Sequence, residues 1–234
     1  MPLDINCDLG EAEPVSRTRA LFRWIGSANV ACGGHAGDLL SMARCVEWAK
    51  RHDVRLGAHP GLSGNFGRAS VPISGPELAL LVAQQVSVLA AWAKRQRVQL
   101  HHIKLHGALY HATEANPALA LAYLQTIQEW APRCRVMALA GGRVCAMGEG
   151  LGLRVIHEGF LDRGYRADGT LVPRGEVGSL LTFEQVRARL RDLAAGQAPR
   201  SVDGIGLMVR PTSWCIHGDG PDALRIAKAA RAIV

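Results

Sequence analysis

The sequence predicts an α/β protein in which about seven parallel strands form a distorted (β/α) barrel. Short apolar stretches alternate with longer amphipathic ones along the chain, which is typical of repeated strand–helix units. Ionisable residues follow nearly every apolar stretch. In a closed barrel all these strand ends meet at one mouth, whereas a doubly wound sheet uses only those at its switch point. We therefore expect one barrel domain over residues 1–234.

The first half of the chain supplies four of the expected strands. They cover 3–7, 28–31, 55–58 and 100–105, with helices over about 17–25, 38–52 and 74–96. Asp38 can cap the second helix, and Ser74 with Glu77 forms a capping box at the start of the third. The uncharged run 78–93 is too short to span a bilayer and is expected to be a buried helix.

The second half continues the alternation. Expected strands cover 135–139, 153–157 and 213–216, and expected helices cover 116–130, 142–150, 182–196 and a last segment opened by Pro221. Two segments rich in turn residues, 62–73 and 168–178, are long enough to be flaps over a site. The apolar segment 204–209 is a candidate accessory strand.

Composition limits the classes of partner. The formal charge of +7 suits an anionic substrate or an acidic partner, but basic side chains on helix surfaces explain it more simply. No basic block interleaved with aromatic residues marks a nucleic-acid surface. Six cysteines without a CxxC pair indicate reduced thiols, and no signal peptide is expected, so we expect a cytoplasmic protein without a membrane or nucleic-acid partner.

Eight short motifs carry most of the residues with reactive side chains. Glycines in the second motif permit positive φ angles and close approach of a ligand beside His35. In chain order the motifs are DINCDLGE (4–11), SANVACGGHAGD (27–38), GAHPG (57–61), FGR (66–68), HGALY (106–110), DRGY (162–165), DGTLVPR (168–174) and CIHGD (215–219).

These motifs, in this order, resemble the LamB/YcsF family, the A subunits of prokaryotic ATP-dependent 5-oxoprolinases, over essentially the whole chain. The resemblance implies a barrel related to metal-dependent polysaccharide deacetylases. It also implies opening of the lactam ring of 5-oxoproline to give L-glutamate. ATP would be consumed by a complex with partner subunits B and C, which suits a chain without a phosphate-loop motif. A homo-oligomer is left open.

Opening a lactam needs a base for water, an acid for the departing nitrogen, and cations around developing negative charge. Asp8 is the expected base, because a carboxylate among buried strand ends can have a raised pKa. The alternative is that Asp8 only caps the turn through Gly10. Asn6 and Glu11 beside it favour the catalytic interpretation.

Three histidines and one lysine complete the expected catalytic set. His35, His59 and His106 adjoin glycine or proline turns and are candidates for the acid and electrophile roles, although each alone could be a core histidine. Lys104 is expected to neutralise an oxyanion or hold a phosphate. With Asp8, the three histidines are also candidate ligands for a divalent metal.

Further polar residues of the motifs are expected to bind substrate. Arg163 and Arg174 suit a carboxylate or phosphate through paired hydrogen bonds, or else form internal ion pairs with Asp162 or Glu158. The expected substrate-binding residues are Asn6, Glu11, Asp38, Arg68, Tyr110, Arg163, Arg174 and His217.

Two other functions compete with the ring-opening hydrolase. One is a stand-alone metal-dependent deacetylase or amidohydrolase acting on a carbohydrate or another amide, which would need neither ATP nor partners. Low aromatic content argues mildly against a sugar groove. The other is a non-catalytic binding protein, which the density of ionisable residues at strand ends disfavours.

Overall fold

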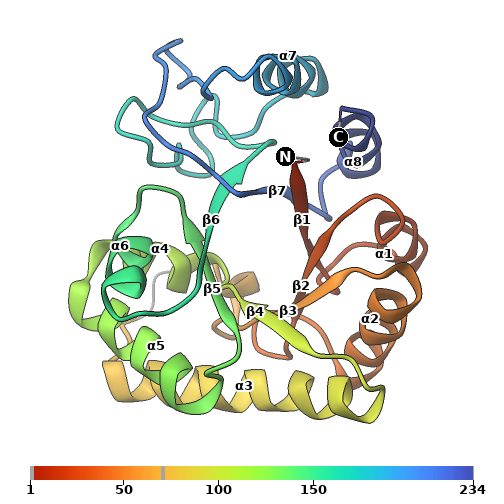
Figure 1. Cartoon of the computed structure of the whole chain (residues 1–234), viewed down its shortest axis with the longest axis vertical. Helices are drawn as coiled ribbons and strands as arrows, with labels where there is room; N and C mark the ends of the chain where they lie inside the picture. Colours follow the sequence, from red (N-terminus) through yellow and green to blue (C-terminus); the bar gives the residue numbers. More distant parts are fainter. Residues whose placement is uncertain (1–2, 70–71, 234) are drawn as a thin grey trace.

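A computed structural model describes residues 3–69 and 72–233 of the chain. Parallel strands form a closed barrel in which each strand pairs with its neighbour in sequence, and the last strand pairs with the first (Figure 1). The predicted barrel of about seven strands is confirmed. The strands are β1 (Asp4–Leu9), β2 (Ser27–Ala31), β3 (Arg55–His59), β4 (Leu100–Ile103), β5 (Arg135–Leu139), β6 (Val155–Phe160) and β7 (Ser213–His217).

Helices surround the barrel strands (Figure 1). A short 3-10 turn, Asn65–Gly67, lies in the predicted 62–73 loop, of which Ser70 and Val71 lie outside the described residues. The helices are α1 (Val15–Leu21), α2 (Leu39–His52), α3 (Gly75–Arg95), α4 (Gly107–Ala115), α5 (Pro117–Trp130), α6 (Arg143–Gly150), α7 (Phe183–Ala194) and α8 (Ala223–Arg231).

Several elements differ from the sequence predictions. Strand β4 ends at Ile103 rather than at residue 105, and α1 spans Val15–Leu21 rather than 17–25. The HGALY motif runs into helix α4, which the sequence analysis does not predict. Strand β6 begins two residues later than expected and continues to Phe160, so Glu158 lies within the strand. The segment 204–209 forms no strand, and only an isolated bridge between Arg200 and Gly206 is present there. The predicted Asp38 cap of α2 and the predicted capping box of α3 are confirmed, and α7 also begins with a capping box, formed by Thr182 and Gln185.

Helix α3 extends beyond the uncharged run 78–93 at both ends, close to the predicted bounds 74–96. Its 21 residues are long and apolar enough to cross a bilayer by length and composition alone. One such helix is weak support for a membrane span, because core helices of soluble proteins pass the same test. The buried residues of α3 recur every three or four positions on one face, which packs toward α5 and the barrel; they are Leu78, Val82, Val86, Leu89 and Ala93.

The interior of the barrel is polar below the candidate site. The Asn6 amide donates to Ser213 Oγ at 2.8 Å, and the Asn29 amide donates to Asn6 Oδ1 at 2.8 Å. His102 Nε2 donates to Asn29 Oδ1 at 2.6 Å. Barrel interiors are usually filled by branched aliphatic side chains. Here a hydrogen-bonded network fills the space and supports Asp8, which accepts from the Asn29 amide at 2.7 Å.

We predict that Gly57→Ala destabilises the protein by about 1–3 kcal/mol through overpacking. An added Cβ would lie 2.1 Å from His102 Nε2 and would disturb its bond to Asn29. Urea denaturation measures the loss. The matched control is Gly150→Ala, where an added Cβ meets nothing within 4 Å. Equal stability of the two variants would contradict the packing argument.

Candidate active site

A buried ammonium group joins three strands at the carboxyl end of the barrel. Lys104 follows β4, and its Nζ lies 2.8 Å from Asp8 Oδ1 on β1 and 2.7 Å from Glu158 Oε1 on β6. The ammonium also contacts Cys215 Sγ on β7 at 3.2 Å. All four residues are buried. Ion pairs in such surroundings are strong in Coulombic terms but costly to desolvate.

The two carboxylates differ in protonation behaviour. Burial by itself would raise the pKa of Asp8. Lys104 and His59 together lower this pKa by a larger amount, so it lies well below the ordinary value. The expectation of a raised Asp8 pKa is therefore wrong. Burial raises the pKa of Glu158, and Lys104 offsets only part of that rise. Burial lowers the pKa of Lys104. Nearby negative groups, chiefly Asp8, raise this pKa by a larger amount, so the ammonium stays charged.

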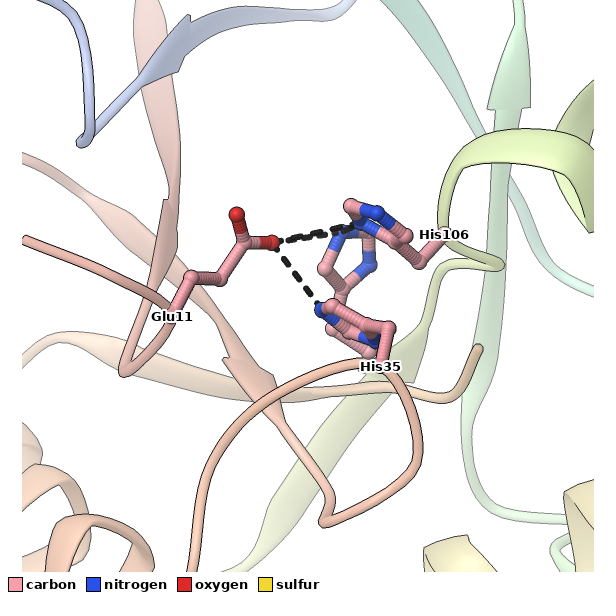
Figure 2. A group of neighbouring side chains, drawn as sticks. Glu11, His35 and His106 are labelled. Atoms are coloured by element: carbon pink, nitrogen blue, oxygen red, sulfur yellow. Dashed lines mark hydrogen bonds and ion pairs between the residues drawn. The ribbon is translucent and has the colours of Figure 1, made fainter. Parts of the chain in front are cut away.

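Three imidazole rings converge on one carboxylate oxygen beside this ion cluster. Glu11 Oε1 lies 3.1 Å from His35 Nε2, 3.2 Å from His106 Nδ1 and 3.6 Å from His59 Nε2. Figure 2 shows the Glu11 carboxylate facing His35 and His106. The rings of His35 and His106 stack in parallel with centroids 3.6 Å apart, and the His59 ring meets both edge-on.

Two glycines of the motifs make this stacking possible. A Cβ on Gly61 would lie 2.5 Å from His35 Nδ1, and a Cβ on Gly67 would lie 2.9 Å from His35 Cβ. Gly67 also has a positive φ of 63°, which other residues rarely adopt. The turns after β3 thus require glycine so that His35 and His106 can meet.

Hydrogen bonding and burial define the protonation of Glu11, His35 and His106. Burial lowers the pKa of His35 to about 4, and burial likewise lowers the pKa of His106. Burial raises the pKa of Glu11, but hydrogen bonds from His106 and His35 reverse this and leave it below the ordinary value. The site therefore holds an ionised carboxylate beside imidazoles that favour the neutral form.

The orientation of His59 is fixed by the backbone. Its Nδ1 lies 2.8 Å from the carbonyl oxygen of Lys104, which can only accept a hydrogen bond. Nδ1 therefore carries a hydrogen, and in the neutral ring Nε2 has a free lone pair. That Nε2 lies 3.5 Å from Asp8 Oδ2 and 3.0 Å from His106 Nδ1. This lone pair can accept a hydrogen bond or bind a cation.

A cavity of about 350 Å³ opens above these groups. Three arginines, Arg68, Arg163 and Arg174, lie in its wall. Arg68 reaches across to Asp219 at 3.2 Å. The other lining residues include Asp8, His59, Lys104, His106, Tyr110, His111, Phe160, Leu171 and His217. The cavity thus combines an ionisable floor with a cationic wall, and its volume suits a small anionic molecule.

Arg163 bonds to neither of the two acids proposed as its partners. Its guanidinium donates to the carbonyls of Ser179 at 2.8 Å and Val172 at 2.7 Å, which anchors the 168–178 segment. Asp162 instead pairs with His217, whose Nδ1 lies 3.0 Å away. Burial lowers the pKa of His217, but Asp162 raises it by more, so the protonated ring is favoured.

Three predicted substrate-binding residues, Asn6, Glu11 and Asp38, are not among the residues that line the cavity. Glu11 lies among the histidines beside it. Asp38 is exposed, and its carboxylate accepts the backbone N–H of Ser41 as the cap of α2. Asn6 lies within the barrel network. Conversely, the sequence analysis names Glu158 only as a possible ion-pair partner of an arginine, and it assigns no role to His111. It places Glu158 beyond the end of its strand, and alternation along β6 would have turned it inward had the boundary been right.

The order of motifs along this site has a counterpart among known proteins. A family model described as LamB/YcsF family matches residues 3–234. The chain belongs to the LamB/YcsF family. A LamB/YcsF relative from Pyrococcus abyssi, named as the A subunit of 5-oxoprolinase, is 38% identical over 240 residues, which cover 100% of this chain and 94% of the relative.

Two solved structures resemble the fold of this chain. The lactam utilization protein from Thermus thermophilus superposes with a TM-score of 0.90 at 33% identity, covering 100% of this chain and 96% of that one. A protein from Agrobacterium tumefaciens gives a TM-score of 0.58 at 13% identity, covering 97% of this chain and 81% of that one. The second likeness concerns the fold alone.

We predict that Lys104→Met destabilises the protein by about 3–5 kcal/mol at neutral pH, because two buried carboxylates lose their counter-charge. In the wild type, the lowered pKa of Asp8 gives stability above its unfolded pKa that is lost as the pH falls. Without Lys104 the folded-state pKa values of Asp8 and Glu158 are raised, so stability is instead lost as the pH rises.

The difference from wild type should therefore shrink between pH 7 and about pH 4.5, as measured by urea denaturation at both values. Lys94→Met, at an exposed position on α3, serves as the control and should change stability little. An equal loss for Lys104→Met at both pH values would contradict the charge argument.

Proposed function

We propose that this chain is the ring-opening subunit of an ATP-dependent 5-oxoprolinase that converts 5-oxoproline to L-glutamate. Subunits B and C would be its partners and would couple ATP to activation of the lactam. The names of the Pyrococcus abyssi and Thermus thermophilus relatives support the substrate class. The observation that carries the proposal is the 350 Å³ cavity in which His106, whose pKa is lowered by burial, and the Asp8–Lys104 ion pair lie below an arginine wall.

The chemistry of a five-membered lactam explains why such a site is needed. Its amide is stabilised by resonance, so the carbonyl requires activation before water can add. If a partner transfers a phosphoryl group from ATP to the amide oxygen, the ring carbon becomes electrophilic. Water then forms a C–O bond and loses a proton, the C–N bond breaks, and the nitrogen takes its electron pair and a proton. The resulting acyl phosphate is hydrolysed to glutamate and phosphate.

Groups beside the cavity can take up the proton of the attacking water. His106 favours its neutral form and can accept the proton of the attacking water. The adjacent His59 can pass this proton on, since its Nε2 lies 3.0 Å from His106 Nδ1. Asp8 is 3.5 Å from His59 Nε2 and stabilises the ring when it is protonated. Asp8 thus acts beside the histidines rather than as a raised-pKa base.

The cationic groups suit the charges of the activated substrate. Arg68 and Arg174 line the cavity and can bind the substrate carboxylate or a phosphate through paired hydrogen bonds. Lys104 lies at the floor, where it can stabilise negative charge on the oxygen of the tetrahedral intermediate. Arg163 keeps the wall in place through its bonds to two carbonyls.

Asp8→Asn should lower glutamate formation at least about 100-fold, because the amide cannot stabilise an imidazolium at His59. The assay mixes the chain with subunits B and C, ATP and 5-oxoproline, and each component is omitted in turn. Asp203→Asn, an exposed loop position, is the control and should keep wild-type turnover. Wild-type turnover in a folded Asp8→Asn variant would rule out this role for Asp8.

The second candidate is a metal-dependent deacetylase or amidohydrolase that acts alone. It is favoured by Glu11, His35, His59 and His106, whose ligand atoms lie within 4.8 Å of one another. Asp8, the carboxylate predicted as a ligand, groups instead with Cys215 and His217.

The donor set fits a divalent ion. Imidazole nitrogen and carboxylate oxygen are common zinc ligands. The bond from His59 Nδ1 to a backbone carbonyl is the outer arrangement that usually orients a metal-binding histidine. A bound ion would act as a Lewis acid toward a carbonyl oxygen. Glu11 and the three histidines would hold it.

We predict that protein purified without chelator contains about one divalent ion per chain, held by these four ligands. Glu11→Gln should reduce the metal content measured by elemental analysis and should lower the melting temperature of the metal-loaded protein. His157→Gln, which alters a half-exposed histidine paired with Glu149, is the control. Absence of stoichiometric metal, with no effect of chelator on melting or turnover, would exclude the metal. Turnover without ATP and partners would favour the second function over the first.

A further inference from the structure

A second cavity, of about 550 Å³, lies at the amino-terminal end of the barrel, opposite the candidate active site. It is bounded by the starts of β3, β4 and β5 and by the ends of α2 and α3. Six cationic residues line it: Lys50, Arg55, Arg97, Arg133, Arg135 and Arg154. Asp53 is the only acidic residue in this lining. So many like charges around one concavity raise its positive potential.

Few of these charges are neutralised within the protein. Arg55 pairs with Asp4 at 2.6 Å. Lys50 Nζ donates to the carbonyl of Gln96 at 3.0 Å, and the Arg154 guanidinium donates to the carbonyl of Arg133. Within residues 3–69 and 72–233, the side chains of Arg97, Arg133 and Arg135 have no ion pair. The cavity therefore holds cationic groups that are free to bind an external anion.

The backbone at Arg97 is unusual for an arginine. Its φ is 59°, in the left-handed region that glycine normally occupies just beyond a helix. An L-residue there costs about 1 kcal/mol relative to glycine. Arg97 nevertheless follows the last turn of α3, where the N–H of Val98 bonds to the carbonyl of Ala93 at 2.9 Å. The left-handed backbone is thus tolerated at a position whose side chain adds a positive charge to the cavity.

The positive charges of this cavity also affect the pKa of His101, which lies beside them. Burial and, to a smaller extent, the charges of Arg135, Arg55 and Arg154 together lower the pKa of His101 to about 4. His101 lines the cavity and therefore offers a neutral ring rather than another cation. The positive potential is thus built from the arginines and Lys50.

We propose that this cavity binds a small polyanion that carries two or more linked phosphate groups. Guanidinium groups form paired hydrogen bonds with phosphate oxygens, and cationic side chains from several elements can contact successive phosphates. The lining contains no phenylalanine, tyrosine or tryptophan that would stack on a base. Recognition therefore rests on the phosphate chain, whether it is inorganic or part of a nucleotide. The site is independent of the reaction proposed at the other end of the barrel.

Titration calorimetry with inorganic tripolyphosphate at low ionic strength tests the site. We expect saturable binding by the wild type that weakens as salt is added, because exposed charges are screened. The double variant R135A/R154A should lose at least about tenfold in affinity. The matched double variant R187A/R191A on exposed α7 should bind as the wild type does. Arg174→Ala, in the wall of the other cavity, should also leave this binding unchanged.

A second variant distinguishes a loss of tripolyphosphate binding at the site from a loss caused by misfolding. Arg97→Gly relieves the left-handed backbone and should keep or raise the melting temperature while it weakens tripolyphosphate binding. ATP should bind about as tightly as tripolyphosphate, and orthophosphate much more weakly.

Absence of saturable binding at low salt would overturn the proposal. Equal affinity for orthophosphate, or an affinity loss that appears in Arg174→Ala but not in R135A/R154A, would also overturn it.

Discussion

The buried ammonium of Lys104 is the constraint on which the barrel and its site both depend. Taking a charge out of water costs several kcal/mol, and only nearby opposite charges can offset this. Asp8 and Glu158 provide them from β1 and β6, which lie on different sides of β4 in the closed barrel. The two carboxyl groups beside Lys104 have opposite pKa shifts: the pKa of Asp8 is lowered, which keeps it ionised, and the pKa of Glu158 is raised. Separation of protonation states at one site is the usual basis of acid–base chemistry.

Support for this cluster extends through the barrel as a series of hydrogen bonds. At the amino-terminal end, Asp4 accepts from Arg55 at 2.6 Å and from Ser213 Oγ at 2.6 Å. Ser213 accepts from Asn6, which is bonded through Asn29 to Asp8. A buried polar network of this kind stabilises only if its members are paired, and it then specifies one arrangement of side chains. The two cavities thus lie at the ends of one continuous polar interior.

Local patterns in the sequence were sufficient for much of the fold. The alternation of apolar stretches predicted the barrel strands, and Asp38, Ser74 and Thr182 predicted the starts of three helices, because these signals act over a few neighbouring residues. Boundaries were less certain. The sequence does not predict helix α4, and it predicts that β6 ends before Glu158. Both errors arise because short apolar runs fit a strand or a helix equally well.

The order of strands and motifs along the chain is enough to predict which reactive residue types reach the mouth of the barrel. Asp8, His35, His59, Lys104 and His106 follow or end strands, and parallel strands bring such ends together. The partners of these residues depend on packing in three dimensions. The tertiary structure placed Glu11 among the histidines, put Glu158 beside Lys104 and left Asp38 outside the cavity, where it only caps a helix. Hydrogen bonds and pKa shifts depend on distances of a few ångströms between strands far apart in the chain, and no local pattern encodes those distances.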